Sequence, residues 1–139
     1  TGVREAVSSL IGVPAFYPDL TLYEQLRLIN ATWSVPERES DTRVAAVLDQ
    51  FGIEALSKRF IHELSSGQTQ MFYLAATFLR PFTVLILDEP EQRLDPGRKS
   101  QLVNAMRHAK VRGAAIVFTS HDAALVERVA DRTITLTSA

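Results

Sequence analysis

Cysteine is absent from this chain of 139 residues, and there is neither a long hydrophobic run nor an excess of charge of one sign. The lack of cysteine excludes disulfide bonds, thiolate nucleophiles and cysteine-ligated zinc sites. The most apolar window, Met71 to Leu79, is far shorter than the roughly 20 residues that a membrane-spanning helix needs. A formal net charge of −1 gives no electrostatic reason to expect nucleic acid or an anionic membrane surface as a partner.

What is present is ordinary for a soluble globular domain, with 46% hydrophobic and 22% charged residues. The first half has apolar residues at helical spacing, and Thr21 to Glu24 has the form of a capping box. The segment from Thr1 to Gly12 fits a helix or, over Val7 to Ile11, a short strand. The pattern then predicts helices over residues 22–33, 41–51 and 53–58, a polar break over 34–40, and a long helix that follows Gln68 and ends near 79.

The second half alternates between strand and helix patterns. Strands are expected over 83–90, 114–119 and 132–137, with helices over 97–111 and 123–130 between them. The run Val84 to Leu87 has no polar alternation, which is typical of a strand buried on both faces. The sequence therefore predicts an α/β fold in which a helical part precedes a parallel, helix-covered sheet with right-handed crossovers.

Two adjacent carboxylates, Asp88 and Glu89, follow the first of these apolar runs directly. Pro90 cannot continue a central strand, so both carboxylates are expected at its carboxyl end. Open α/β sheets bind their ligands at this edge, and neighbouring carboxylates there suit Mg²⁺ binding together with activation of water. The alternative is an ordinary acidic turn at the end of a buried strand.

His121 stands at the end of the next apolar run, as Asp88 and Glu89 do at the end of the first. Because parallel strands bring their carboxyl ends to one edge, His121 is expected to approach the acidic pair. The alternative is a capping or partly buried histidine. His62 and His108 have no partners suggested by spacing and are expected at the surface.

Ser65, Ser66, Gly67 and Gln68 precede the long helix and form a candidate anion site. Small residues leave the first backbone N–H groups of a helix unobstructed, and the helix dipole favours negative charge there. A serine hydroxyl can add a further donor. The alternative is a simple N-cap followed by a flexible glycine.

These segments together resemble the ATP-binding cassette (ABC) ATPase family. The resemblance rests on Leu64-Ser65-Ser66-Gly67-Gln68, Val84-Leu85-Ile86-Leu87-Asp88-Glu89-Pro90, Leu94-Asp95-Pro96 and Thr119-Ser120-His121-Asp122, which match its signature motif, Walker B strand, D-loop and switch histidine in order and spacing. By this resemblance, residues 1–139 are the C-terminal part of one nucleotide-binding domain. About 20–79 would be the helical signature subdomain, and about 80–139 the Walker B to switch-histidine part of a P-loop-NTPase-type sheet.

The resemblance also implies roles for single residues, with ATP and Mg²⁺ as cofactors. Asp88 would bind Mg²⁺, Glu89 would orient and polarise the attacking water, and His121 would contact the γ-phosphate. Ser65 to Gln68 would contact ATP held by a second nucleotide-binding domain. Asp95 would belong to the loop that communicates across that dimer.

The chain departs from the family pattern in several places. No G-x-x-x-x-G-K-S/T occurs in it, so the phosphate-binding P-loop is missing. Either Thr1 lies partway through a longer domain, or the protein has lost ATP binding. Ser66 replaces a glycine of the signature, Gly12 stands in place of the Q-loop glutamine, and Glu91 to Arg93 make the D-loop bulkier and more charged than usual.

The function that the resemblance implies is the ATP-hydrolysing subunit of an ABC transporter. Its partners would be a transmembrane permease and a second nucleotide-binding domain, at the cytoplasmic face of the cell membrane, with no nucleic acid expected. The isolated chain is expected to be inactive without a P-loop. The alternatives are a soluble ABC-type ATPase of translation or nucleic-acid metabolism, and a non-hydrolytic interaction module.

Overall fold

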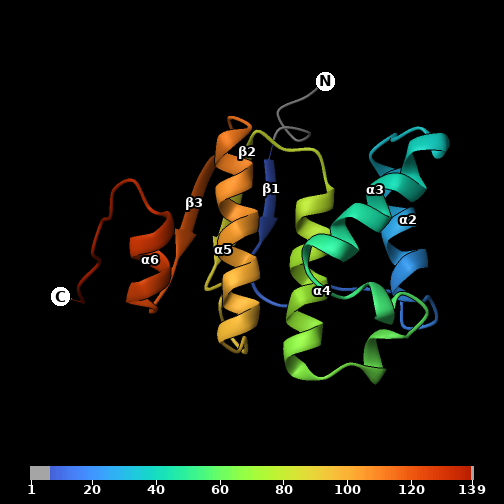
Figure 1. Cartoon of the computed structure of the whole chain (residues 1–139), viewed down its shortest axis with the longest axis horizontal. Coiled ribbons are helices and arrows are strands. Elements are labelled where there is room, and N and C mark those ends of the chain that lie inside the picture. Colours follow the sequence, from blue (N-terminus) through green and yellow to red (C-terminus); the bar gives the residue numbers. More distant parts are fainter. Residues whose placement is uncertain (1–6, 139) are drawn as a thin grey trace.

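A parallel sheet forms the centre of the fold. The computed structural model describes residues 7–138, and in this range the sheet consists of β1 (Val7–Leu10), β2 (Val84–Asp88) and β3 (Ala115–Thr119). Both pairings are parallel and β2 lies in the centre (Figure 1). The predicted α/β fold with a parallel sheet is confirmed, and the ambiguous start of the chain forms a strand from Val7. The part of that segment before Val7 lies outside the described residues.

Helices connect the strands, and local sequence signals start most of them. They are α2 (Leu22–Thr32), α3 (Glu37–Gln50), α4 (Ser66–Leu79), α5 (Pro96–Val111) and α6 (Ala123–Val129), with short 3₁₀ helices η1 (Glu54–Leu56) and η2 (Ile61–Glu63). Thr21 forms a capping box at the start of α2, and Ser65 forms one at the start of α4. Asp95 and Asp122 cap α5 and α6 through their carboxylates. These caps pair N–H groups that a helix start otherwise leaves unsatisfied.

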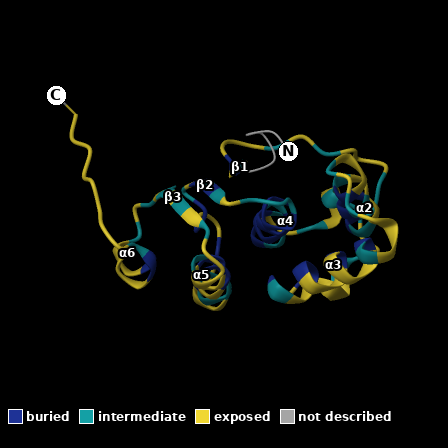
Figure 2. Ribbon diagram, turned by 90° about the horizontal axis from the view of Figure 1, so that it is seen from above, coloured by how far each residue is buried: buried dark blue, intermediate teal, exposed yellow. Residues whose placement is uncertain are grey.

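One face of the sheet is covered by helices. Figure 2 shows α4, α5 and α6 on the same side of the three strands, with α2 and α3 beside α4. Leu85 and Leu87 of β2 are buried in the hydrophobic core, whereas Val84 and Ile86 are only half-buried. Val117 of β3 is 62% exposed. The expectation of a strand buried on both faces is therefore wrong for the described residues, because no described helix covers the second face.

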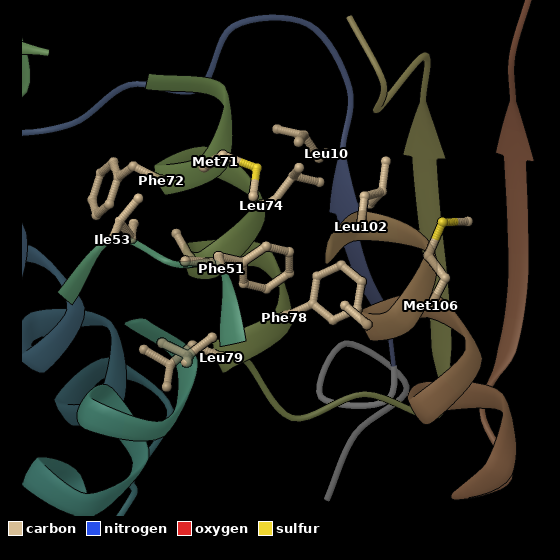
Figure 3. Packing of buried hydrophobic residues seen from close by; sticks show 14 of the residues in the cluster. Leu10, Phe51, Ile53, Met71, Phe72, Leu74, Phe78, Leu79, Leu102 and Met106 are labelled. Atoms are coloured by element: carbon tan, nitrogen blue, oxygen red, sulfur yellow. The ribbon is translucent and has the colours of Figure 1, made fainter. Parts of the chain in front are cut away.

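The helical part and the sheet share one hydrophobic core. Phe51, at the end of α3, packs edge-on against Phe78 of α4 with ring centroids 5.1 Å apart. On the other side of α4, the core continues to Leu102 and Met106 of α5 (Figure 3). The division of the chain near residue 80 stays a prediction, but the apolar packing is continuous across it.

Several predicted elements differ in the structure, and the helix expected over 53–58 is only the short 3₁₀ helix Glu54–Leu56. Helix α3 begins at Glu37 rather than near residue 41, because Pro36, with φ −56°, occupies the N-cap position and does not interrupt the helix. The predicted strand over 132–137 does not form, and Ile134 and Leu136 are 81% and 89% exposed. An alternating pattern favours a strand only where a neighbouring strand supplies its hydrogen bonds.

Candidate functional site

The carboxyl ends of β2 and β3 bring the predicted acidic pair and the predicted histidine together. The strand register pairs Asp88 with Thr119, whose Oγ1 donates a hydrogen bond to Asp88 Oδ1 at 2.5 Å. His121 follows two residues after Thr119, and its Nε2 lies 2.6 Å from Glu89 Oε1. The His121 side chain is 92% exposed and that of Glu89 is 27% exposed. The cluster thus opens to solvent on the histidine side, where a ligand has access.

The Glu89 backbone and side chain are both held in place. Its φ is +47°, a left-handed conformation that costs a non-glycine residue free energy and persists only where neighbouring contacts impose it. The Glu89 N–H donates to Thr119 Oγ1 at 3.0 Å and to the Thr119 carbonyl at 3.1 Å. Gln92 Nε2 donates to the second carboxylate oxygen, Oε2. Both Glu89 oxygens therefore have partners from this chain, and the carboxylate is fixed at the edge of the sheet.

A small cleft of about 140 Å³ lies beside these carboxylates. Its lining comes from the end of β1 and the segment after it, from α4, and from the segment after β2: Leu10, Gly12, Val13, Gln70, Tyr73, Asp88, Glu89, Gln92 and Arg93. No group of three or more histidine, aspartate or glutamate side chains placed to bind a metal ion occurs among residues 7–138. A single exposed carboxylate such as Asp88 still fits Mg²⁺, which proteins bind through one or two carboxylates together with substrate phosphates and water.

At the start of α4, Ser65 is the N-cap and Ser66 to Gln68 form the first turn, whereas all four residues were expected to precede the helix. Ser65 Oγ accepts from Gln68 N at 3.1 Å, and Gln68 Oε1 accepts from Ser65 N at 2.9 Å. Ser66 is exposed in the first turn and is not among the residues with positive φ, so the serine in the glycine position strains no backbone. The structure does not bring these residues into contact with Glu89 or His121; they occupy a separate helix start.

Gly67 lies against the segment that follows β2. A Cβ atom at Gly67 would be 3.0 Å from the Arg93 carbonyl oxygen and 2.9 Å from Arg98 Nη1. One turn later, Gln70 Nε2 donates to the Pro90 carbonyl at 3.0 Å in a buried position. The start of α4 and the loop after β2 are therefore fixed to each other within one chain, and glycine is the residue that allows this approach.

Asp95 has a structural role in this chain. Its Oδ1 accepts from Arg98 N at 2.8 Å at the start of α5, and its Oδ2 lies 3.1 Å from Arg98 Nη1. Neither contact connects Asp95 to Glu89 or His121.

Three residues near the carboxylates were not predicted from the sequence. Thr119 bonds to both Asp88 and Glu89, Gln92 bonds to Glu89, and Ser120 donates from its hydroxyl to the buried Glu91. The register of two parallel strands that end at the same edge could have indicated Thr119, since it is paired with Asp88. No sequence signal indicates Gln92, whose contact with Glu89 is a feature of the loop after β2.

An ion pair close to the site ties α6 to α5. Lys99 Nζ donates to Asp122 Oδ2 at 2.9 Å, and Asp122 Oδ1 caps α6. The hydrogen bond from Lys99 holds the pKa of Asp122 below its usual value, and the hydrogen bond to Asp122 holds the pKa of Lys99 above its usual value. His121 precedes Asp122 directly, so this pair helps to fix the end of the segment that carries the histidine.

The Asp122→Asn substitution, which keeps a capping oxygen, is expected to lower stability by a nearly constant amount in the range from about pH 4 to pH 10. The pKa of Asp122 is lower in the folded state than in the unfolded state. Its contribution to the free energy of unfolding is therefore present above the unfolded-state pKa and is lost as pH falls through the folded-state pKa. The pKa of Lys99 is raised in the folded state, so the stabilisation that Lys99 contributes has the opposite pH dependence. It is present below the unfolded-state pKa and is lost only as pH rises above about 10. Urea unfolding of both proteins from about pH 2 to about pH 11 measures the difference. Asp19→Asn, at an exposed carboxylate, is the control; a difference between wild type and Asp122→Asn that does not shrink on acidification would contradict the assignment.

A protein-family model and two relatives of known sequence match this chain. The model of a family described as "AAA domain, putative AbiEii toxin, Type IV TA system" matches residues 22–127. The ABC transporter ATP-binding protein YthP of Bacillus subtilis is 31% identical over 119 residues, which are 86% of this chain and 50% of YthP. The ABC-type transporter ATP-binding protein EcsA of the same organism is 30% identical over 135 residues, 97% of this chain and 55% of EcsA.

A solved structure supports the same relationship. The ATP-binding subunit of an ABC transporter superimposes with a TM-score of 0.83 at 31% identity, covering 92% of this chain and 53% of that subunit. The chain thus spans about half the length of the relatives that it matches. The family model covers most of the chain, and the parallel sheet is of the P-loop NTPase type. The chain therefore belongs to the AAA-domain family, as a relative of the ATP-binding subunits of ABC transporters.

Proposed function

We propose that the protein hydrolyses ATP to drive transport through a membrane permease, and that this chain supplies the carboxylate and histidine side of its active site. The observation that carries the proposal is the contact of 2.6 Å between His121 Nε2 and Glu89 Oε1, beside Asp88, at the carboxyl edge of the sheet. The names of the relatives, which are ATP-binding proteins of ABC transporters, support the same function.

In this proposal each side chain has one task. Asp88 would hold Mg²⁺, and the bound ion would neutralise phosphate charge. Glu89, fixed by Thr119 and Gln92, orients and polarises the water that attacks the γ-phosphate. The exposed His121 contacts the γ-phosphate oxygens. Catalysis then comes from positioning and from electrostatic stabilisation, as is general for phosphoryl transfer.

A second nucleotide-binding domain is part of the proposal. At the start of α4, the Gln68 N–H is paired with Ser65 Oγ, and the backbone N–H groups of Ser66 and Gly67 are the first-turn donors that suit a phosphate. Ser65, Ser66, Gly67 and Gln68 are proposed to contact ATP held by that second domain, and Asp95 to lie in the loop between the two. Within the described residues, no helix is long and apolar enough to cross a membrane. The names of the relatives, ATP-binding proteins of ABC transporters, support the further proposal that a separate permease carries out transport and that this subunit lies at the cytoplasmic face of the membrane.

The direct test is phosphate release from MgATP by the full-length protein. The expected result is Mg²⁺-dependent release that EDTA abolishes, since the proposed chemistry needs the cation that Asp88 binds. A purified, folded protein that releases no phosphate from MgATP, alone or with its permease, would overturn the proposed function.

The chain of 139 residues by itself is expected to bind MgATP weakly or not detectably. The sequence contains no G-x-x-x-x-G-K-S/T segment, and the backbone N–H groups of that loop are the main phosphate ligands in this class of ATPase. Isothermal titration calorimetry of the 139-residue chain measures the affinity. Micromolar binding of MgATP by this chain would contradict the expectation, and the same titration on the full-length protein is the positive control.

A further inference from the structure

A second and larger cavity lies at the opposite edge of the sheet from Asp88. Its volume is about 370 Å³, within the range of sites that bind small molecules. It is bounded by the end of α4, the segment that leads into β2, the turn from α5 to β3, and one residue of α3. Among its lining residues are Arg43, Phe78, Arg80, Phe82 and Arg112.

The charged residues of this lining are all arginines. Arg43, Arg80 and Arg112 contribute to it, and no aspartate or glutamate is among the lining residues that the structure describes. Glu39 is not a lining residue, but it forms an ion pair with Arg43 at an N···O distance of 3.4 Å and offsets part of its positive charge. Both side chains of this pair are about half exposed. The cavity therefore combines an apolar wall, which includes Phe78 and Phe82, with guanidinium groups from three different elements.

Arg80 has a buried donor without an acceptor. Among the described residues, its Nε is the buried side-chain nitrogen or oxygen atom that has no hydrogen-bond partner. Burial lowers the pKa of the Arg80 guanidinium below its usual value. A buried polar group without a partner lowers the stability of the fold, so loss of this nitrogen is not expected to destabilise the protein.

The ends of two helices account for part of this charge but not for the missing acceptor. Arg80 and Arg112 are the C-cap residues of α4 and α5, where each helix end contributes about half a negative charge that favours cations. Two such ends together with Glu39 offset about two of the three arginine charges. The remaining balance is positive, and neither helix end supplies an acceptor to Arg80 Nε.

From a cavity lined by three arginines and by no carboxylate among the described residues, we propose that this cavity is a binding site for a small molecule with an oxyanion group, a phosphate or a carboxylate. Guanidinium groups bind both oxyanions through paired, charge-assisted hydrogen bonds. Arg80 is the anchoring residue, and Arg43 and Arg112 close the site from α3 and from the end of α5. The site lies at the other edge of the sheet from Glu89 and His121, and the inference does not rest on the proposed ATPase function.

The test measures the melting temperature of the full-length protein with sodium phosphate and, separately, with sodium succinate, against sodium chloride at matched ionic strength. Wild type is expected to gain about 3 °C or more at tenfold excess of the anion over its Kd. Arg80→Met keeps an unbranched apolar side chain but removes the guanidinium. Without an anion, this variant is expected to melt at the wild-type temperature or above it, because it removes an unpaired buried donor; with the anion, it is expected to gain nothing.

Arg38→Gln is the matched control, since Arg38 is an exposed arginine on the same helix as Arg43 but is not part of the cavity. Its melting temperature is expected to rise as much as that of wild type. Arg112→Gln is expected to bind the anion roughly tenfold more weakly or worse.

A rise in melting temperature with phosphate alone or with succinate alone identifies the oxyanion class. Anion binding at the Asp88 edge would stabilise wild type and Arg80→Met equally. Equal gains in those two proteins, or no gain in wild type with either anion, would overturn the proposal.

Discussion

Replacement of Glu89 by glutamine in the full-length protein is expected to lower ATP hydrolysis by about 100-fold or more while leaving ATP binding unchanged. Glutamine has the same shape and can still accept a hydrogen bond from His121. It lacks the negative charge that polarises the attacking water. The backbone hydrogen bonds to Thr119 do not involve the side chain, so the strained backbone at this position is maintained. Phosphate release at saturating MgATP measures the rate, and equilibrium binding of a fluorescent ATP analogue measures the affinity.

Glu127→Gln is the matched control for this experiment. Glu127 is an exposed carboxylate on α6, away from the carboxyl ends of β2 and β3, and its substitution is expected to leave hydrolysis at the wild-type rate. If Glu89→Gln retained more than half of the wild-type rate, Glu89 could not be the residue that orients the attacking water. If both rate and ATP affinity fell together, the substitution would have disturbed the site rather than the chemical step.

The Phe51→Ala substitution is expected to lower the free energy of unfolding by about 3–5 kcal/mol. Phe51 is 1% exposed, and its ring packs edge-on against Phe78 in the core that joins α3 to α4. Removing the ring loses its burial and leaves a cavity that neighbouring helices fill only in part. Urea denaturation followed by circular dichroism gives the change. Since the core is continuous, the whole transition is expected to shift to lower urea concentration as one step.

Tyr17→Ala is the control for the core substitution, because Tyr17 is also aromatic but is 63% exposed. It is expected to change stability by about 0.5 kcal/mol or less. A loss below about 1 kcal/mol for Phe51→Ala would contradict the view that α3 and α4 share one well-packed core. Two separate unfolding steps in the variant would instead show that the helical part unfolds independently of the sheet.

Much of the fold follows from local signals. The capping boxes at Thr21 and Ser65 depend on side chains that bond to backbone groups three residues away, so short sequence patterns are enough to predict where α2 and α4 begin. The approach of His121 to Glu89 was also predicted, although the two residues are 32 positions apart. A general rule made this possible: parallel strands bring their carboxyl ends to the same edge of a sheet.

Other features depended on partners that the local pattern does not specify. Residues 132–137 alternate as a strand does, yet they remain exposed because no strand of the described residues lies beside them to supply hydrogen bonds. The apolar run Val84 to Leu87 suggested burial on both faces, and helices cover only one of them. A hydrophobic pattern records which side chains can be buried, while the neighbouring elements decide which of them are buried.

By itself, the sequence determined the α/β class, the main helix caps and the residues that meet at the carboxyl edge, because each depends on short-range chemistry or on a rule of parallel sheets. Only the tertiary structure decided that Glu89 takes a left-handed backbone conformation, and that Gln92 and Thr119 hold it. Only the tertiary structure brings Arg43, Arg80 and Arg112 to one cavity. Contacts of this kind join residues from separate elements, and their geometry depends on how those elements pack, which no short stretch of sequence encodes.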